Sequence, residues 1–442
     1  MTNMALFSVF GLLFGGQLEA WGLETTGVAV ISSTMTSVQN FSGLLVGPLV
    51  KRLGARAVSL MGGLLTSCGM SLSYFATDPW HIFLTWGFLV GLGVGLLVPA
   101  TFLNISAWFS TRRSQAVGIS LAGTGLGQIA LPHLVRVLLE EYGFHGCVLI
   151  IGALALHSIP GCLLFRKPRL IRDPVEASES QPLKPKKDKP LHEPVAAPPP
   201  KDAKPAPAVA VLEGAGDRHG GVLAAMKRVA LAMDLDLFLN LRFMNLAVGT
   251  GLIYTTMTSF SMIFPFFLME TVGMSRAVTA TLMSVQSGAD LVSRLLLPQV
   301  MGGAKCGGHG LPARTVMIVG AVGSAASRSV MAELRGFTEL IVMAAVTGMF
   351  RGATVLNQNL VIAEHVPAAK LPSAIGLAMV VKGACVLGFG SALGVVRDYS
   401  GSYSIFIHSL TALALVTAVS WALESLCCRA SRRPDEDADA GR

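Results

Sequence analysis

The sequence is a succession of long apolar runs without charges, separated by short segments that carry most of the lysines and arginines. A helix of about 20 apolar residues spans the hydrocarbon core of a bilayer. Inside lipid a helix also satisfies all of its own backbone hydrogen bonds. Charged residues make up 14% of the chain, whereas soluble domains carry about 25%. The sequence therefore predicts an all-α membrane protein rather than a soluble enzyme.

The apolar runs form two groups of six on either side of a polar stretch. We expect spans near 4–20, 27–50, 57–77, 81–103, 114–138 and 145–165, and then near 241–268, 277–300, 314–332, 337–361, 372–396 and 402–426. The predicted domains are an N-terminal half at 1–165, a linker at 166–240, a C-terminal half at 241–426 and a tail at 427–442. The first run is short for a span, so we expect the first helix to be incomplete, the alternative being a shortened and tilted helix.

The linker is rich in proline, lysine and alanine and nearly free of aromatic residues. Such a composition cannot bury enough apolar surface to fold, so the linker is predicted to be largely disordered. A tether between the halves is one interpretation of its role, and a proline-rich ligand for a partner protein is the other.

The basic residues of the loops indicate how the spans are oriented, because cytoplasmic loops carry an excess of Lys and Arg. With the first loop outside, the inner loops hold Lys51, Arg52, Arg56, Arg112, Arg113, Lys305, Arg314 and Lys370. This arrangement predicts that both termini are cytoplasmic. No concentrated basic patch or aromatic platform accompanies these residues, so no nucleic-acid partner is predicted. The seven cysteines form no CxxC pair, and neither a metal nor a cofactor is predicted.

The loop after the second predicted span reads GPLVKRLGARAVSLMGG. Its glycines let two helices approach closely, and its basic residues anchor the membrane surface. The pattern of Gly47, Arg52, Gly54 and Arg56 resembles a loop motif of the major facilitator superfamily, with Lys51 where many members carry Asp. The resemblance implies a conformational role.

A second motif begins at Trp108 and reads WFSTRRSQAVGISLAGTGLG. It is similar to the fifth-helix signature of the monocarboxylate transporter family. The matching residues are Trp108, Phe109, Arg112, Arg113, Ala116, Gly118, Ala122, Gly123 and Gly127. Segments that begin at Glu364 and Arg397 also look like the last helices of that family. We give the two arginines a conformational role as well.

Two opposite charges lie inside the eighth predicted span. Asp290 and Arg294 are four residues apart, which places them on one helical face where they can pair. Each charge costs at least about 2.5–3.5 kcal/mol at the centre of a bilayer, so such residues are functional candidates. The pair either locks two helices, or it offers the Arg294 guanidinium to a substrate carboxylate while Asp290 exchanges a proton. The same pair occurs in the eighth helix of monocarboxylate transporters, and the resemblance implies the second interpretation.

Further polar residues lie inside the later predicted spans. Arg351 and Lys382 either line a cavity or pair with interfacial groups, and Asn357 is a candidate cavity-lining residue. The chain also departs from the family, because Ser8 stands where proton-coupled members carry lysine. The departure predicts weaker proton coupling.

The resemblance covers nearly the whole chain except the linker and tail, and it identifies an insect-like member. It implies a major facilitator fold with about twelve helices in two halves, a substrate site between them and alternating access. The leading hypothesis is transport of a monocarboxylate or related organic anion across the plasma membrane, with or without a proton. The alternatives are an uncoupled carrier of a larger amphipathic solute, such as an aromatic amino acid or a carnitine-like molecule, and a non-transporting sensor or scaffold. An accessory single-span glycoprotein, which some members have, is left open.

Overall fold

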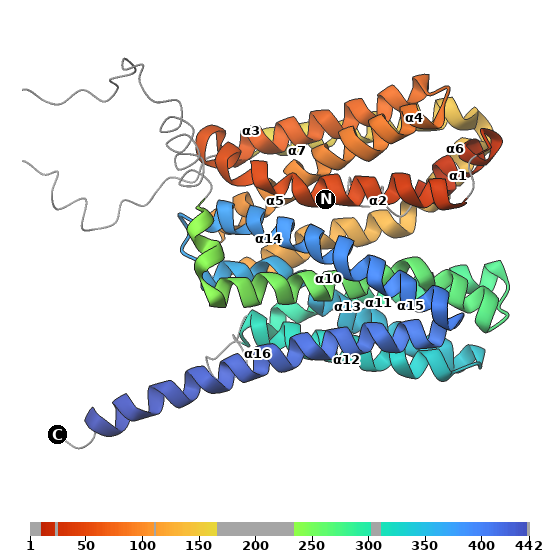
Figure 1. The fold of residues 1–442 in the computed structure, drawn as a ribbon. Coiled ribbons are helices and arrows are strands. Elements are labelled where there is room, and N and C mark those ends of the chain that lie inside the picture. Colours follow the sequence, from red (N-terminus) through yellow and green to blue (C-terminus); the bar gives the residue numbers. More distant parts are fainter. Residues whose placement is uncertain (1–9, 23–24, 110–111, 166–233, 302–310, 440–442) are drawn as a thin grey trace, which may run out of the picture. The chain divides into compact units, whose positions relative to one another are not determined.

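The computed structural model describes residues 10–22, 25–109, 112–165, 234–301 and 311–439. Within these ranges the chain consists of helices and their connections, and it contains no strand. Figure 1 shows the helices side by side along one direction, as expected for spans of a bilayer. The 166–233 part of the predicted linker and Ser8 lie outside the described residues.

The helices of the N-terminal half follow the predicted runs. They are α1 (Phe10–Ala20), α2 (Thr25–Phe41), α3 (Gly43–Leu72), α4 (Pro79–Ile82), α5 (Gly91–Trp108), α6 (Arg113–Leu156) and α7 (Ser158–Leu163), with a 3₁₀ turn η2 (Ser73–Phe75) and a π-helical stretch η3 (Phe83–Val90).

The C-terminal half begins with a short 3₁₀ turn inside the predicted linker. Its elements are η4 (Leu235–Leu239), α10 (Leu241–Phe266), α11 (Arg276–Met301), α12 (Ala313–Glu333), α13 (Phe337–His365), α14 (Leu371–Cys385), α15 (Ser391–Ser400) and α16 (Tyr403–Asp439), with π-helical stretches η5 (Phe267–Thr271) and η6 (Val386–Gly390). The Asn240 side chain caps α10 by accepting hydrogen bonds from the backbone of Arg242 and Phe243. This cap explains why the helix begins where it does.

Two long helices are each broken by a glycine with a positive φ. Gly54 in α3 has φ 82° and ψ 156°, and Gly143 in α6 has φ 63° and ψ −173°. A side chain at such a φ would be strained, so glycine is the residue that turns the chain here. The breaks place the second and third predicted spans on either side of Gly54, and the fifth and sixth on either side of Gly143. Each predicted run therefore has a helical counterpart among the described residues.

Eight helical stretches among the described residues are long and apolar enough to cross a membrane. Helices α1 and α2 fall short in length, with 11 and 17 residues. Helix α11 is 26 residues long, but it carries the charged pair and several other polar side chains.

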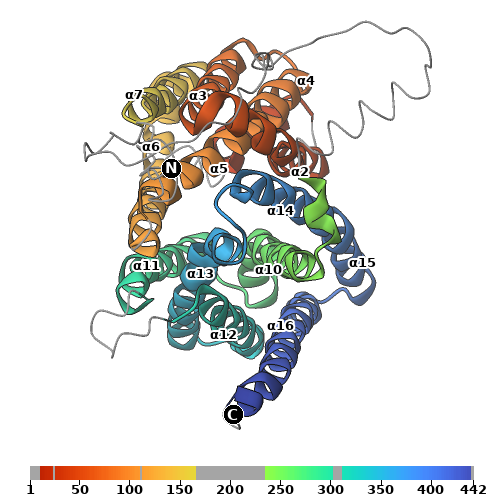
Figure 2. The same cartoon turned by 90° about the vertical axis from the view of Figure 1, so that its left-hand side faces the viewer.

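Three buried cores hold the helices together. One lies within the N-terminal half, where Phe10 and Phe14 pack on Trp86 with ring centroids 5.4 and 5.1 Å apart. A second lies within the C-terminal half around Phe264 and Ile407. The largest core contains residues of both halves. Figure 2, turned by 90°, shows α14 beside α2 and α11 beside α6, so helices of the two halves pack directly on one another.

The predicted domain boundaries stay predictions. Residues Asp234 to Asn240 belong to the predicted linker, and the structure describes them as η4 and its flanks. Helix α16 continues to Asp439, beyond the predicted boundary at 426. The expectation of an incomplete first helix stays a prediction.

Candidate functional site

The charged pair of α11 is fully enclosed in the bundle. The side chains of Asp290 and Arg294 are 0% and 3% exposed, and Oδ2 of Asp290 lies 2.5 Å from Nη2 of Arg294. Nevertheless neither carboxylate oxygen meets a donor in hydrogen-bond geometry. The charges are close because both side chains leave the same helix one turn apart, but they are not aligned for a hydrogen bond.

Small residues bring two other helices close to this pair. A Cβ atom on Gly352 of α13 would lie 2.6 Å from the backbone oxygen of Asp290, and one on Gly118 of α6 would lie 2.5 Å from that of Arg294. Helix α11 is thus packed between one helix of each half. Nη1 of Arg294 donates to the backbone oxygen of Leu121 in α6 at 3.3 Å, while its Nε has no partner. The guanidinium therefore reaches across to the other half.

Helix α13 presents a polar stripe in which Arg351 is the charged member. Thr347, Arg351, Thr354 and Gln358 follow one another at helical spacing on one face,. Nε of Arg351 is buried without a hydrogen-bond partner. Asn357 is fully buried, donates to the backbone oxygen of Ala353 at 2.8 Å and leaves its Oδ1 unpartnered. Both residues thus keep unused hydrogen-bonding atoms inside the bundle.

Lys382 of α14 points toward the same stripe. Its Nζ donates to Oε1 of Gln358 at 3.2 Å and lies 5.7 Å from the centre of the Tyr254 ring. A Cβ atom on the next residue, Gly383, would meet Asn40 of α2 at 3.1 Å. Lys382 is therefore buried where α14 faces the N-terminal half.

Sequence reasoning missed one buried cation, Arg328 of α12. Its side chain is almost completely buried. Nε donates to the backbone oxygen of Ser324 at 2.9 Å and Nη1 to that of Thr256 at 3.0 Å, and the guanidinium carbon lies 5.3 Å from the centre of the Phe260 ring. The signal was present, because Arg328 lies well inside an otherwise uncharged predicted span.

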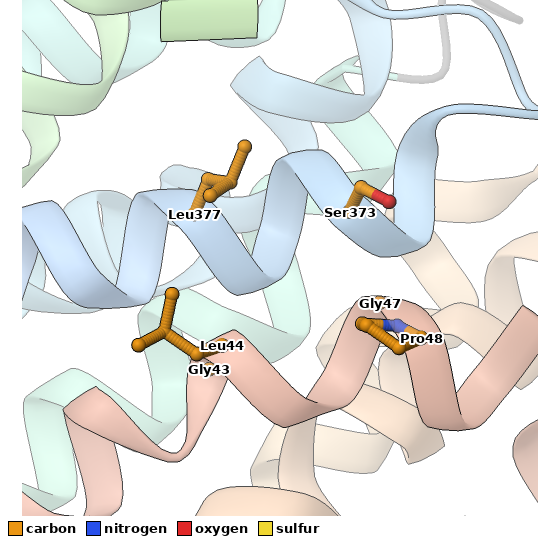
Figure 3. A pocket seen from close by; sticks show the side chains of 6 residues that line it. All are labelled: Gly43, Leu44, Gly47, Pro48, Ser373 and Leu377. Carbon is orange, nitrogen blue, oxygen red and sulfur yellow. The ribbon is translucent and has the colours of Figure 1, made fainter. Parts of the chain in front are cut away.

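The glycine motif lies where α3 meets α14. Figure 3 shows Gly43, Leu44, Gly47 and Pro48 on α3 facing Ser373 and Leu377 on α14 across a small crevice. A Cβ atom on Gly43 would lie 2.3 Å from the backbone oxygen of Gly376, and one on Gly47 would lie 2.9 Å from Cα of Ser373. Glycine is required at both positions because the two backbones touch.

The basic residues of the two motifs lie at the same end of the molecule. Arg52, Arg56 and Arg112 are exposed. Arg113 is half-buried, and its Nη1 lies 3.4 Å from the backbone oxygen of Ala363 at the end of α13. The structure therefore brings Gly47 and Arg113 into contact with the opposite half and leaves the other arginines at the surface.

Comparison with solved structures shows the fold. The MFS transporter FucP in its outward conformation matches with a TM-score of 0.64 and 14% identity, covering 96% of both chains. The human organic anion transporter MFSD10 (TETRAN) matches with a TM-score of 0.63 and 13% identity, covering 95% of this chain and 96% of that one.

Comparison with curated proteins shows the resemblance to monocarboxylate transporters. Monocarboxylate transporter 13 of Bos taurus is 36% identical over 166 residues, which is 38% of this chain and 39% of that protein. Monocarboxylate transporter 11 of Homo sapiens is 36% identical over 164 residues, 37% of this chain and 35% of that protein. The chain thus matches less than two fifths of the length of these relatives.

Comparison with family models covers more of the chain. The model of the Major Facilitator Superfamily matches residues 1–301, which include every helix of the N-terminal half and helices α10 and α11. That superfamily consists of membrane transporters, and the bundle of helices described above has its fold. The chain belongs to the Major Facilitator Superfamily.

Proposed function

We propose that this protein transports an organic anion, such as a monocarboxylate, across the plasma membrane by alternating access. The observation that carries the proposal is the buried pair on α11, in which Asp290 has no aligned donor and Arg294 reaches the N-terminal half. A purely structural ion pair would be expected to satisfy both partners, because buried charges are costly when they are incompletely paired.

Arg294 is the proposed anchor for the substrate carboxylate. A guanidinium can bind a carboxylate through two parallel hydrogen bonds, and Nε of Arg294 has no partner in the protein. Asp290 competes with the substrate for the same cation. When Asp290 is ionised it holds Arg294, and when it takes up a proton the attraction is lost and the guanidinium is available to the substrate. This competition would couple a proton to the anion.

Movement between the halves is the proposed means of access. The contacts at Gly43–Gly376 and Gly47–Ser373, together with Arg113 on Ala363, join the halves at the end where the basic residues lie. Rocking of one half against the other would open this end while the opposite end closes. We propose that this end is cytoplasmic, as are both termini, because it carries the basic loops.

The test is uptake of a labelled panel of carboxylates into cells at two external pH values. Uptake of at least one carboxylate, lost in Arg294→Gln at unchanged surface expression, supports the proposal. Because Ser8 replaces the lysine of proton-coupled relatives, we expect the uptake rate to rise less than tenfold per unit of acidification. Uptake restricted to larger amphipathic solutes and independent of pH would favour the uncoupled carrier. No uptake of any solute, with capture of proteins by the linker, would favour the sensor or scaffold.

A further inference from the structure

The interior of the C-terminal half holds more positive than negative charge. Of the charged side chains that are buried in the described residues, Arg294, Arg328 and Lys382 are cations and Asp290 is the one carboxylate. Arg351 is half-buried among them and adds a further cation. Asp290 can neutralise one cation, so the rest lack an acidic partner among the described residues. Uncompensated charge inside a membrane protein is expensive and is expected to serve binding.

The excess cations lie near one another around α13. Arg351 precedes Gly352, where a Cβ atom would lie 2.6 Å from the backbone oxygen of Asp290 on α11. Two other residues of the stripe contact the elements that carry the other cations. Thr347 donates a hydrogen bond at 2.9 Å to Ser327, which precedes Arg328 in α12. Gln358 accepts a hydrogen bond from Lys382 of α14. Arg351 therefore lies between Arg328 at one end of the stripe and Lys382 at the other.

Arg351 keeps a free hydrogen-bond donor, and Arg328 has more donors than its described hydrogen bonds use. A guanidinium has five N–H donors, and the described hydrogen bonds of Arg328 use two of them, both on backbone oxygens. Arg351 has a buried Nε without a partner. Backbone oxygens and the Phe260 ring orient Arg328 but do not neutralise it. An anionic group placed between the two guanidinium groups would supply the missing charge and accept the free donors.

We propose that the substrate is an organic dianion, whose first carboxylate binds Arg294 and whose second anionic group binds Arg328 and Arg351. This inference rests on the proposed function and narrows it from organic anions to those with two anionic groups. A dicarboxylate is the simplest ligand of this class. The Asp290–Arg294 pair accounts for recognition of one carboxylate, and Arg328 and Arg351 account for the second.

The test measures ligand-induced thermal stabilisation of the purified full chain at constant ionic strength. The probes are succinate, glutarate and adipate, each compared with the monocarboxylate of equal chain length. A ligand that binds the folded state raises the melting temperature. We expect at least one dicarboxylate to bind more tightly than its monocarboxylate. In Arg328→Gln this preference should disappear, with dicarboxylate affinity weakened about 30-fold or more, while monocarboxylate binding is kept.

Two further variants separate this inference from the proposed function. Arg294→Gln should lose the response to both series, because it removes the shared anchor. Arg335→Gln is the matched control, since Arg335 is exposed just beyond α12 and should leave both responses unchanged. Because Arg328 also joins α12 to α10, Arg351→Gln provides a second test of the same subsite if Arg328→Gln does not fold.

The outcomes distinguish the two proposals. Equal binding of monocarboxylates and dicarboxylates to the wild type would overturn the dianion inference and leave the anion transporter standing. If neither monocarboxylates nor dicarboxylates raised the melting temperature, both the dianion inference and the proposed anion transport would be contradicted. A dicarboxylate preference that survives in Arg328→Gln and Arg351→Gln would show that these arginines have a structural role only.

Discussion

Charges are arranged differently in the interior of the C-terminal half and at the basic end of the molecule, by which we mean the end that carries Lys51, Arg113, Arg314 and Lys370. At the basic end Lys51, Arg314 and Lys370 each have an acidic partner, whereas Arg113 meets a backbone oxygen. Lys51 pairs with Asp234, and Lys370 lies 2.5 Å from Asp236. In the interior the cations outnumber the carboxylates, although burying a charge without a partner costs far more free energy there than at the surface.

The half-buried pair between α12 and α16 shows what a purely structural arrangement looks like in this molecule. Arg314 donates to Glu424 at 2.9 Å and to the backbone oxygen of Trp421 at 2.9 Å. Glu424 also accepts from Asn245 of α10 at 2.5 Å. Each carboxylate oxygen has a donor, whereas neither oxygen of Asp290 has one that is aligned. Nε of Arg314 lacks a partner, as does Nε of Arg294, so the two pairs differ in their carboxylates. We propose that the paired charges hold helices together and that the unevenly paired charges serve a ligand.

Exchanging the charges on α11 should have the largest effect. Asp290→Arg with Arg294→Asp keeps a pair at the same spacing but moves the cation by one turn, about 6 Å along the helix. We expect the protein to reach the membrane and uptake per molecule to fall by a factor of about 100 or more, because the anchor no longer faces the substrate. Uptake of a labelled carboxylate, normalised to surface-labelled protein, measures this.

The pair of Arg136 and Glu140 on α6 is the matched control for the exchange. It has the same spacing, with both side chains more than 60% exposed, and its exchange should leave uptake unchanged. Normal uptake by the exchanged α11 pair would show that it only holds helices, and would place it in the same class as Arg314 and Glu424.

Widening the glycine contact between α3 and α14 should have the next largest effect. Gly376→Val adds atoms where a Cβ would already lie 2.2 Å from the backbone oxygen of Gly43. We expect a loss of about 1–3 kcal/mol in the free energy of unfolding and strongly reduced uptake, because this end can no longer close. Gly161→Val on α7 is the control, since nothing lies near a Cβ there. Unchanged uptake in Gly376→Val would mean that the close approach is not needed for transport.

Removing the charge of Glu424 should lower stability without abolishing transport. Glu424→Gln weakens charged hydrogen bonds to Arg314 and Asn245, which typically contribute about 1.5–3 kcal/mol each to stability, so we expect a lower denaturation midpoint with similar uptake per folded molecule. Glu333→Gln is the control, because its pair with His408 is exposed. If folded Glu424→Gln lost all uptake, the ion pair of Glu424 with Arg314 would be needed for transport as well as for stability.

Breaking the partly exposed pair of Lys51 and Asp234 should have the smallest effect. Lys51→Gln should change the free energy of unfolding by less than about 1 kcal/mol, and the difference from wild type should vanish in high salt. Arg52→Gln, at the adjacent exposed position, is the control. A larger loss in Lys51→Gln that persists in high salt would show that this pair is more than a screened surface interaction.

The pairs at the basic end should not respond to pH in the physiological range. Partial burial raises the pKa of Asp234, but the hydrogen bond and charge of Lys51 outweigh it, so the pKa lies below its usual value. The stabilisation by Asp234 is therefore present above about pH 4 and is lost as the pH falls through the lowered pKa. The hydrogen bond to Asp236 raises the pKa of Lys370, so its contribution is present below about pH 10 and is lost above it. A pH dependence of uptake between pH 5 and 8 should survive in Lys51→Gln.

Much of the site followed from the sequence because a charge inside an apolar run is visible without a structure. Asp290 and Arg294 were predicted to share one helical face, and their ion pair confirms the spacing argument. Arg328 was missed although it is equally visible, because its neighbours suggested no pair. The assignment of all these residues to a substrate site stays a proposal.

The sequence by itself determined the membrane character, the helical class and the order of the spans, since apolar runs can be stable in lipid only as helices with their hydrogen bonds closed internally. It also indicated the family, through short motifs that the family comparison confirms. Which spans contact one another was decided by the tertiary structure. The tertiary structure brings together residues that are far apart in the chain. Examples are the contact of Gly43 with Gly376, the hydrogen bond of Arg294 to Leu121 and the grouping of the cations around α13. Such contacts depend on side-chain shape and close backbone approach between helices, and no local pattern in a single sequence encodes them.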